Sequence, residues 1–470
     1  MNSYGDEGLA GATHVIAHSP GSDDGAAAVA RFLERHPNVE TIDVLFSDLS
    51  GILRGKRLPA RKLPQLFERG VRLPGAACSL GINEEIDSGS GVSVQGGPDC
   101  LCKPVGGTLA SVPWSARPAG QTLVSMWQEN GQPYGLDPRQ ILAKVVRTLN
   151  EKGLHPVVAL EVEFYLIERQ AKDPSAPTPA STADRRSSFG PLYGINDLDS
   201  VQDYIAAVYE ACRIQDIAAQ AAMAETGPMQ LEVTLDHCAD ALRACDQLTY
   251  LKRAVRGTAA AFGFDVTFMA KPYADQAGSG LHVHVSLLDE NGQNKFAGSD
   301  FAPGQPLGHA IAGLIDSMPE AMAIFGPNMN SYRRVKGGDQ APSRANWGVN
   351  DRGAAIRVPS SDPANRRIEH RVAAADANPY LTVAAILAGV DHGLEEAAEP
   401  PSASSGDAGR AAKLPAHWVD ALREFERSKL LRRHLGPAAS KVYGALKRRE
   451  LEAFNRQVTP LEYSWYLVQG

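Results

Sequence analysis

Residues 159–166, ALEVEFYL, alternate apolar side chains with two acids, and this alternation constrains the fold of the chain more than any other feature. In a β-strand successive side chains point to opposite faces, so Glu161 and Glu163 share one face with Ala159 and Tyr165. Two carboxylates about 6–7 Å apart repel each other by roughly 2–3 kcal/mol at an effective dielectric constant near 20. Desolvation adds to that cost. The strand therefore predicts a face that is either solvated or neutralised by cations.

Three later segments repeat the pattern. Residues 231–235, LEVTL, carry Glu232, and Glu225 lies seven residues upstream across a Gly-Pro turn. Residues 278–289 (GSGLHVHVSLLD) and 366–372 (RRIEHRV) each place three polar side chains on one face. These are His282, His284 and Ser286 in the first segment, and Arg367, Glu369 and Arg371 in the second. Lysine, which is common on solvated sheets, is absent from all four segments, so we expect the polar faces to converge on a cavity inside a curved sheet.

The residue types on these faces favour hard divalent cations. Five glutamates and one histidine form a donor set that suits Mg²⁺ or Mn²⁺ better than zinc, which prefers cysteine and more histidine. The six residues are Glu161, Glu163, Glu225, Glu232, His282 and Glu369, enough for two ions that keep some water. Residues 330–359 add many arginines, whose forks fit phosphate and carboxylate. Metals and arginines together indicate phosphoryl transfer from a nucleotide, although no P-loop motif occurs.

Composition excludes several other classes of protein. The 470 residues carry a formal net charge of −7, which argues against nucleic-acid binding. The six cysteines include no C-x-x-C pair and no zinc-like Cys/His array. The N-terminal residues show no secretion-signal pattern. We therefore expect a cytoplasmic protein with free thiols.

Two segments predict helices. Residues 136–153 carry Asp137 as a potential cap and Gly153 as a stop. Residues 379–390 form the longest apolar stretch, which is too short to span a bilayer and predicts a buried helix.

The expected secondary structure changes along the chain. Residues 1–25 predict a flexible tail, residues 26–130 a small β-rich domain, and residues 131–470 a larger domain in which helices alternate with strands. Residues 170–188 and 395–415 are rich in Pro, Ser and Ala and predict surface loops. The fold class expected is α+β.

Taken in order, these motifs resemble the glutamine synthetase family. The matches are ALEVEFYL, AETGPMQLEVTL, GSGLHVHVSLLD and NWGVNDRGAAIRVPSSDPANRRIEHRVAAADANPY, and the resemblance runs from DLSGILRGKRLP to FNRQVTPLEYSWYL. It implies an N-terminal β-grasp domain and a C-terminal catalytic domain with a curved antiparallel sheet flanked by helices. It also implies a homo-oligomeric ring with active sites between neighbouring subunits, usually as two stacked hexamers; hexamer and dodecamer both stay open.

The resemblance implies roles for the matched residues, which divide into ligands of two cations, phosphate-holding arginines, and contacts to glutamate or nucleotide. Glu163, Glu225 and Glu232 correspond to ligands of one cation, and Glu161, His282 and Glu369 to ligands of a second, which bridges to the ATP phosphates. Arg352, Arg357 and Arg367 correspond to residues that hold phosphates during transfer. Arg334 and Arg371 correspond to residues that hold the carboxylate of glutamate, near the backbone of Gly278, and His284 and Ser286 resemble nucleotide contacts. Arg352, Glu369 and Arg371 are the residues expected to act in catalysis.

Departures from the family pattern bear on which amine the protein uses as its substrate. Ammonia-using members have an aspartate in an F-D-G-S-S stretch, where residues 70–78 here place Pro74. They also have a glutamate before an Ala-Pro pair, where this chain has Gln340, and an asparagine where it has Ala277. A compact ammonium ion needs charged ligands, so these losses predict a larger amine with Gln340 beside it. The segment beginning RRIEHRV resembles the γ-glutamylpolyamine synthetase branch most.

The expected reaction is ATP-dependent ligation of the γ-carboxylate of L-glutamate, through γ-glutamyl phosphate, to an organic primary amine. Putrescine or another polyamine is the favoured amine, which places the protein in polyamine catabolism. A ligase for ethanolamine, an alkylamine or aniline is the alternative, followed by ordinary glutamine synthesis. A non-catalytic structural or regulatory ring is a third class, against which the intact metal ligands argue. The base that deprotonates the amine stays open, with Asp339 as a candidate, as does the choice between Mg²⁺ and Mn²⁺.

Overall fold

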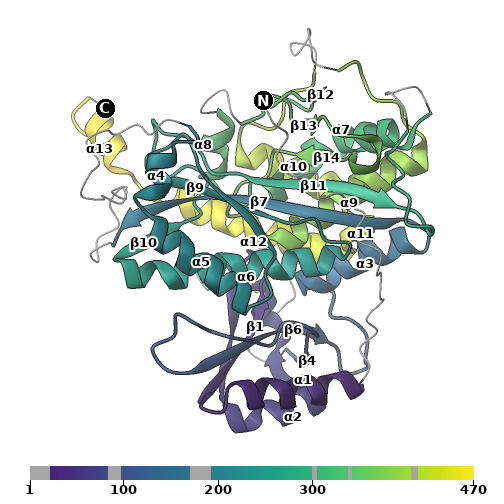
Figure 1. Ribbon diagram of the computed structural model, residues 1–470. Helices are drawn as coiled ribbons and strands as arrows, with labels where there is room; N and C mark the ends of the chain where they lie inside the picture. Colours follow the sequence, from purple (N-terminus) through teal and green to yellow (C-terminus); the bar gives the residue numbers. More distant parts are fainter. Residues whose placement is uncertain are drawn as a thin grey trace.

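The computed structural model describes residues 22–82, 97–169, 192–298, 304–336, 341–403 and 411–469. Its strands form two sheets, a smaller one from the N-terminal part of the chain and a larger one above it (Figure 1). Both sheets combine with helices, so the predicted α+β class is confirmed.

The smaller sheet has the strand order β2-β1-β6-β4-β3, with β5 paired to β6. Its strands are β1 (Thr41–Ser47), β2 (Leu53–Pro59), β3 (Val71–Pro74), β4 (Asp99–Pro104), β5 (Ala110–Ser111) and β6 (Ala119–Trp127). β1 and β6 pair in parallel at the centre, and the β1–β2 hairpin is followed by a helix, which is the strand order of a β-grasp. Helices α1 (Ser22–Arg35) and α2 (Leu63–Arg69) lie below this sheet in Figure 1.

The larger sheet carries the segments with polar faces. Its order is β12-β13-β14-β11-β7-β9-β8, with β10 paired to β7, and all its pairs are antiparallel except β12 with β13. The strands are β7 (His155–Glu168), β8 (Ala219–Ala224), β9 (Gln230–Leu235), β10 (Phe264–Thr267), β11 (Leu281–Leu288), β12 (Trp347–Val349), β13 (Ile356–Val358) and β14 (Ile368–His370). All four alternating segments therefore contain a strand of this one sheet.

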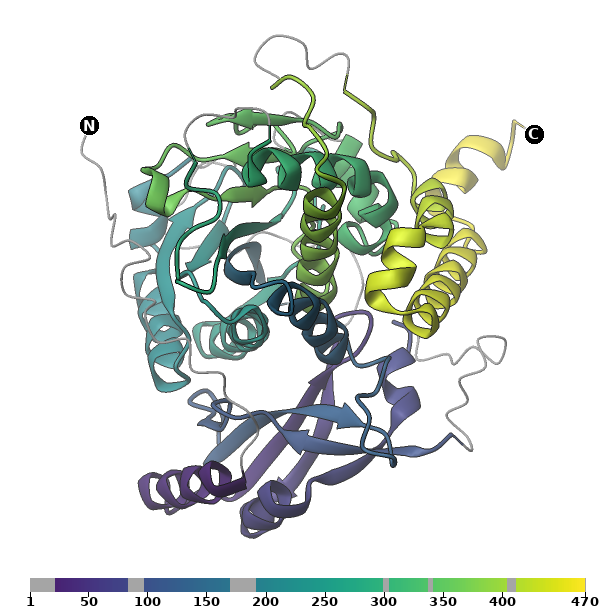
Figure 2. The same ribbon diagram turned by 90° about the vertical axis from the view of Figure 1, so that its right-hand side faces the viewer.

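Helices α3 (Pro138–Asn150) and α6 (Ala241–Ala259) pack against β7 and lie between the two sheets (Figures 1 and 2). The helices of the larger part of the molecule also include α4 (Ile195–Asp199), α5 (Gln202–Ile214), α7 (Pro306–Phe325), α8 (Ser331–Lys336), α9 (Pro379–Glu396), α10 (Trp418–Arg427), α11 (Lys429–Leu435), α12 (Pro437–Asn455) and α13 (Pro460–Tyr466). Short 3₁₀ turns span Ala60–Lys62, Gly75–Ser79, Ala260–Phe262 and Pro363–Asn365.

Both predicted helices are present. Asp137 caps α3 by accepting a hydrogen bond from the Arg139 backbone N–H at 2.9 Å. Helix α9 is buried along most of its length, and Asn378 caps it by accepting from the backbone N–H groups of Tyr380 and Leu381. Within the described residues no helix is both long and apolar enough to cross a bilayer.

Several predicted segments lie partly or wholly outside the described residues. Helix α1 begins at Ser22, inside the predicted tail 1–25, and residues 1–21 lie outside the described part. The predicted loop 170–188 also lies outside it, and α9 runs to Glu396, two residues into the predicted loop 395–415. The division into domains at residues 26–130 and 131–470 stays a prediction.

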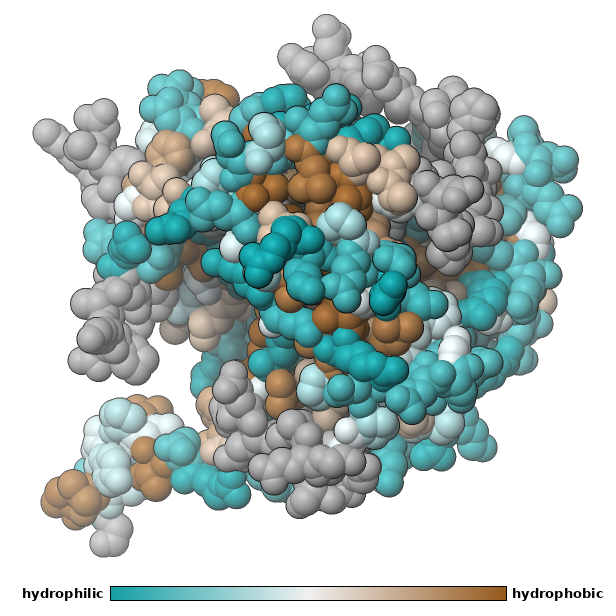
Figure 3. Space-filling model, turned by 90° about the horizontal axis from the view of Figure 1, so that it is seen from below, coloured by the Kyte–Doolittle hydropathy of each residue, from teal (hydrophilic) through white to brown (hydrophobic). Residues whose placement is uncertain are grey.

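The C-terminal helix stands apart from the rest of the molecule. α13 projects beyond the body in Figure 2, and it forms the separate lobe at the lower left of Figure 3. Its large apolar side chains and those that follow are exposed: Leu461, Tyr463, Trp465, Tyr466, Leu467 and Val468. We call these six residues the C-terminal apolar patch.

Candidate active site

Strand register brings the predicted cation ligands opposite one another on the larger sheet. On β7, Glu161 lies directly opposite His282 of β11, and Glu163 lies directly opposite Glu232 of β9. Directly opposed side chains are about 4.5–5.5 Å apart at Cβ and point to the same face. The four residues therefore form one continuous polar surface across three strands.

The same surface continues toward the other edge of the sheet. His284 of β11 lies opposite Glu369 of β14, and Glu369 lies opposite Arg357 of β13. The predicted convergence of four polar faces is thus what the sheet shows.

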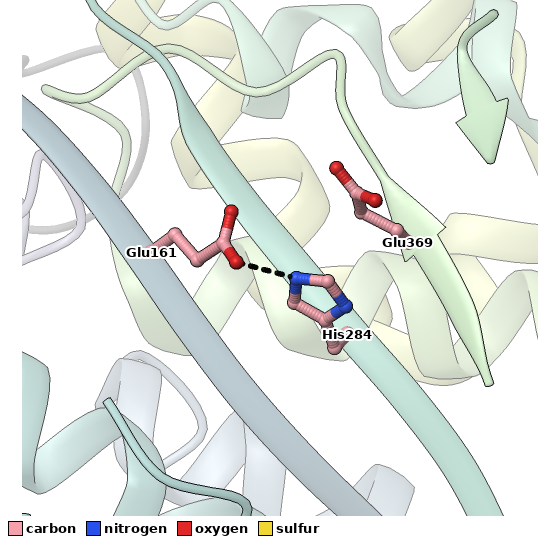
Figure 4. Close-up of side chains that lie close together, drawn as sticks. All are labelled: Glu161, His284 and Glu369. Atoms are coloured by element: carbon pink, nitrogen blue, oxygen red, sulfur yellow. Dashed lines mark hydrogen bonds and ion pairs between the residues drawn. The ribbon is translucent and has the colours of Figure 1, made fainter. Parts of the chain in front are cut away.

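Glu161 connects the two histidines. It accepts hydrogen bonds from His282 Nδ1 at 3.2 Å and from His284 Nε2 at 2.9 Å. Figure 4 shows the Glu161 carboxylate and the His284 ring pointing at each other, with Glu369 beyond. Burial would raise the pKa of Glu161, but the two histidines hold it well below its ordinary value. Glu161 is therefore ionised at neutral pH.

Two groups of side chains have potential ligand atoms within 4.8 Å of one another. One group is Glu161, Glu232 and His282, and the other is Glu161, His284 and Glu369. His284, expected beside the nucleotide, thus lies as close to the carboxylates as His282 does. The predicted assignment of Glu163 and Glu225 to one ion stays a proposal, since neither belongs to these groups.

Glu163 is held by groups at the start of β11 and by Gln230 of β9. Its Oε2 accepts the Gly280 backbone N–H at 2.9 Å and Gln230 Nε2 at 3.2 Å, and Gln230 also donates to the Gly278 carbonyl oxygen at 3.1 Å. The sequence interpretation missed Gln230. It lies two residues before Glu232 and so shares its strand face, which is the signal that could have found it.

The carboxylates repel one another strongly. Burial, reinforced by Glu161 and Glu163, raises the pKa of Glu232 to about 10. Glu225 follows β8, and burial together with Glu163 raises its pKa to about 7. A buried group of carboxylates with raised pKa values fits divalent cations, because a cation replaces the protons and neutralises the repulsion.

Glu369 lies between two arginines. Arg357 Nη1 donates to its Oε2 and Arg371 Nη1 to its Oε1. Its side chain is 1% exposed. Burial would raise its pKa, but His284, His282 and Arg371 lower it to about 2.

The remaining phosphate-contact candidates lie around this surface. Arg367 Nε donates to His284 Nδ1 at 3.3 Å, so the His284 ring accepts at one nitrogen and donates to Glu161 at the other. Ser286 is buried on β11, and its hydroxyl has no hydrogen-bond partner in the described part of the chain. Arg352 is exposed and donates to Tyr193 Oη at 3.1 Å, a contact that the sequence interpretation did not anticipate.

Arg334 is buried beneath the two glycines that precede β11. It donates to the carbonyl oxygens of Val372 at 2.9 Å and Arg371 at 3.4 Å. A Cβ added at Gly278 would come within 2.7 Å of its Cγ, and one at Gly280 within 2.6 Å of its Nη2. Arg334 thus lies next to Gly278, as expected, while its contact with glutamate stays a proposal.

The predicted amine pocket is largely outside the described residues. Gln340 and Asp339 fall in the gap at 337–340. Pro74 ends β3 of the smaller sheet, and the Ala277 carbonyl oxygen accepts a hydrogen bond from Tyr165 Oη at 2.7 Å.

Comparisons with known proteins show which family the chain resembles. Residues 135–466 match the family described as glutamine synthetase, catalytic domain. The chain is 40% identical to the γ-glutamylputrescine synthetase of Escherichia coli K12, with 93% of this chain and 94% of the relative covered. It is 31% identical to a glutamate–isopropylamine ligase of a Pseudomonas species, with 93% and 97% covered. A solved GmaS/ADP complex superposes with a TM-score of 0.80 at 28% identity, covering 93% of this chain and 99% of the other.

Proposed function

The chain belongs to the glutamine synthetase family, and on that basis we propose that it is an ATP-dependent ligase that joins L-glutamate to an organic primary amine. The observation that carries the proposal is the polar surface across β9, β7, β11, β14 and β13. There carboxylates suited to divalent cations meet arginines suited to phosphate.

Two cations, Mg²⁺ or Mn²⁺, would be held by Glu161, Glu163, Glu225, Glu232, His282 and Glu369. When bound, they would neutralise charge on the phosphates of ATP. Arg352, Arg357 and Arg367 would hold the phosphoryl group as it moves to the γ-carboxylate of glutamate, which Arg334 and Arg371 would orient near Gly278. His284 and Ser286 would contact the nucleotide. The amine would then attack the carbonyl carbon of the acyl phosphate, the C–O bond to phosphate would break, and the amine nitrogen would lose a proton as the amide forms.

The amine we propose is putrescine or another polyamine. The 40% identical relative is named for that substrate, and the expected ammonium-binding acids are replaced by Pro74 and Gln340. A second candidate is a ligase for a smaller amine, favoured by the 31% identical relative named for isopropylamine. Glutamine synthesis is the third, since a glutamine synthetase of Pyrococcus abyssi is also 31% identical.

We also propose a homo-oligomeric ring in the cytoplasm, of two stacked hexamers. The C-terminal apolar patch supports an assembly, because monomers rarely expose large contiguous apolar surfaces.

Phosphate release by the purified protein tests the reaction. ATP, Mg²⁺ and L-glutamate are combined with ammonium, putrescine, spermidine, ethanolamine, isopropylamine or aniline in turn. We expect putrescine or spermidine to stimulate release most and γ-glutamylamide to form. Release that no amine stimulates would contradict the proposal.

A further inference from the structure

Arg352 is an exposed arginine with one defined partner. It lies in the turn between β12 and β13, and its Nη1 donates to Tyr193 Oη at 3.1 Å. Within the described residues it forms no ion pair with a carboxylate, whereas Arg357 and Arg371 both pair with Glu369. Because a phenol is neutral, this contact leaves the positive charge of Arg352 available to an anion.

Tyr193 is held in an unusual backbone conformation. Its φ is 62°, a value that bulky side chains rarely adopt and that costs free energy. Its backbone N–H donates to the Ala224 carbonyl oxygen at 3.0 Å, at the end of β8. The tyrosine is thereby fixed to the residue that immediately precedes Glu225.

The two hydrogen bonds of Tyr193 connect Arg352 to the end of β8. The backbone of Tyr193 bonds to Ala224, next to Glu225, and its hydroxyl accepts from Arg352. The phenol, the guanidinium and Glu225 therefore belong to one part of the site, although they come from three separate segments of the chain.

We propose that Tyr193 is a positioning residue for Arg352. Its hydroxyl orients the guanidinium before ATP arrives and leaves the remaining N–H groups for the transferring phosphoryl group. An unrestrained exposed arginine loses much rotamer entropy when it is fixed, and transition-state stabilisation depends on donors that are already in place. The inference rests on the proposed function, because Arg352 needs this orientation only if phosphoryl transfer occurs beside it.

A double-mutant cycle tests the inference. Tyr193→Phe removes only the hydroxyl, Arg352→Ala removes its partner, and Ile195→Ala changes an exposed neighbour as the matched control. We expect Tyr193→Phe to lower kcat about tenfold, the order of one hydrogen bond to a charged group, with KM for ATP within about twofold. In the Arg352→Ala background, Tyr193→Phe should change kcat less than about twofold, because the group it acts through is gone. Ile195→Ala should stay within about twofold of wild type.

Two kinetic results would overturn the inference while leaving the proposed function intact. One is a Tyr193→Phe enzyme as active as Ile195→Ala, and the other is an equal loss of kcat in both backgrounds. Failure of the proposed function itself would appear differently, as no amine-dependent phosphate release by wild type. Crystal structures of wild type and Tyr193→Phe test the inference independently of activity. We expect Arg352 to be ordered against Tyr193 in wild type and displaced in Tyr193→Phe. The same position of Arg352 in both structures would overturn the inference.

Discussion

At the scale of single residues, the site is defined by carboxylates that lie close enough to repel one another. Glu163 and Glu232 lie directly opposite each other, and Glu161 lies two residues from Glu163 on the same strand. Histidine or arginine offsets their repulsion most at Glu161 and Glu369, whose pKa values are lowered. Added cations should therefore reduce the repulsion most on the side of the surface formed by Glu163, Glu225 and Glu232.

Replacing one of these carboxylates should separate activity from stability. Glu163→Gln keeps an oxygen that can accept the Gly280 N–H but removes one negative charge. We expect kcat to fall at least about 100-fold, the scale of losing one electrostatic contact in an active site. The melting temperature without metal should not fall, because repulsion of Glu232 and Glu225 is relieved. Glu168→Gln, at the exposed end of the same strand, is the control, and near-wild-type turnover of Glu163→Gln would contradict the assignment.

Metal binding should depend on pH with a definite sign. The folded-state pKa of Glu225 is about 7 against an ordinary 4.5, so between these values the metal-free folded protein binds more protons than the unfolded chain. The contribution of Glu225 to the stability of the metal-free protein should therefore fall as pH rises from about 4.5 to 7. A cation must displace those protons, so we expect affinity for Mn²⁺ to rise with pH and addition of Mn²⁺ at pH 7 to release about one to two protons per subunit. Calorimetry in buffers of different ionisation enthalpy measures this; affinity independent of pH would count against it.

At the scale of elements, sequence patterns predicted which side chains share a face of a strand better than they predicted which strands pair. The cap at Asp137 and the buried helix over 379–390 follow from local rules, and both are present. Alternation also predicted which side chains of each strand share a face. It could not predict that His284 lies opposite Glu369, because register depends on which strands pair, and the order β14-β11-β7-β9 is not sequential.

Contacts between loops were the least predictable part of the site. Tyr193 and Arg352 are 159 positions apart in irregular segments, so neither periodicity nor turn chemistry connects them. Gln230 could have been found, since it shares a face with Glu232. The resemblance supplied the expected roles of the arginines, which alternation alone does not give.

Helices α7 and α9 pack closely against each other through glycines. A Cβ at Gly313 of α7 would lie 2.2 Å from the Gly389 carbonyl oxygen of α9, and backbone cannot move aside cheaply. We expect Gly313→Ala to destabilise the protein by about 3 kcal/mol. Gly308→Ala, on the same helix with its nearest neighbour at 3.4 Å, should instead stabilise it by about 0.5–1 kcal/mol.

Denaturant or thermal unfolding of the two alanine variants, under identical conditions, measures the difference. Equal stability of Gly313→Ala and Gly308→Ala would mean that the two helices are not held at this separation.

At the scale of the whole molecule, the C-terminal apolar patch is a surface that the proposed assembly would cover. Val468 is 91% exposed and Leu467 72%, on a segment that stands clear of the body (Figures 2 and 3). Burying such side chains is worth roughly 1.5–3 kcal/mol each, so a neighbouring subunit that covers them would gain substantially.

Removal of residues 458–470 should lower the mass of the assembly. We expect light scattering to report a smaller oligomer than for the full chain, while far-UV circular dichroism stays native because α13 contributes nothing to either sheet. Replacing Glu34 and Arg35, two exposed residues of α1, by alanine provides a control at a surface away from the patch. An unchanged mass after truncation would assign assembly to other surfaces.

The most direct test of the account is a competition between two amines in one reaction. Equal concentrations of putrescine and ammonium are incubated with ATP, Mg²⁺, L-glutamate and the enzyme, and the two products are quantified by mass spectrometry. Their ratio gives the ratio of kcat/KM values directly. The account predicts that γ-glutamylputrescine exceeds glutamine at least about tenfold, because the acids that ammonium requires are replaced. Excess glutamine would contradict it and make this chain a glutamine synthetase.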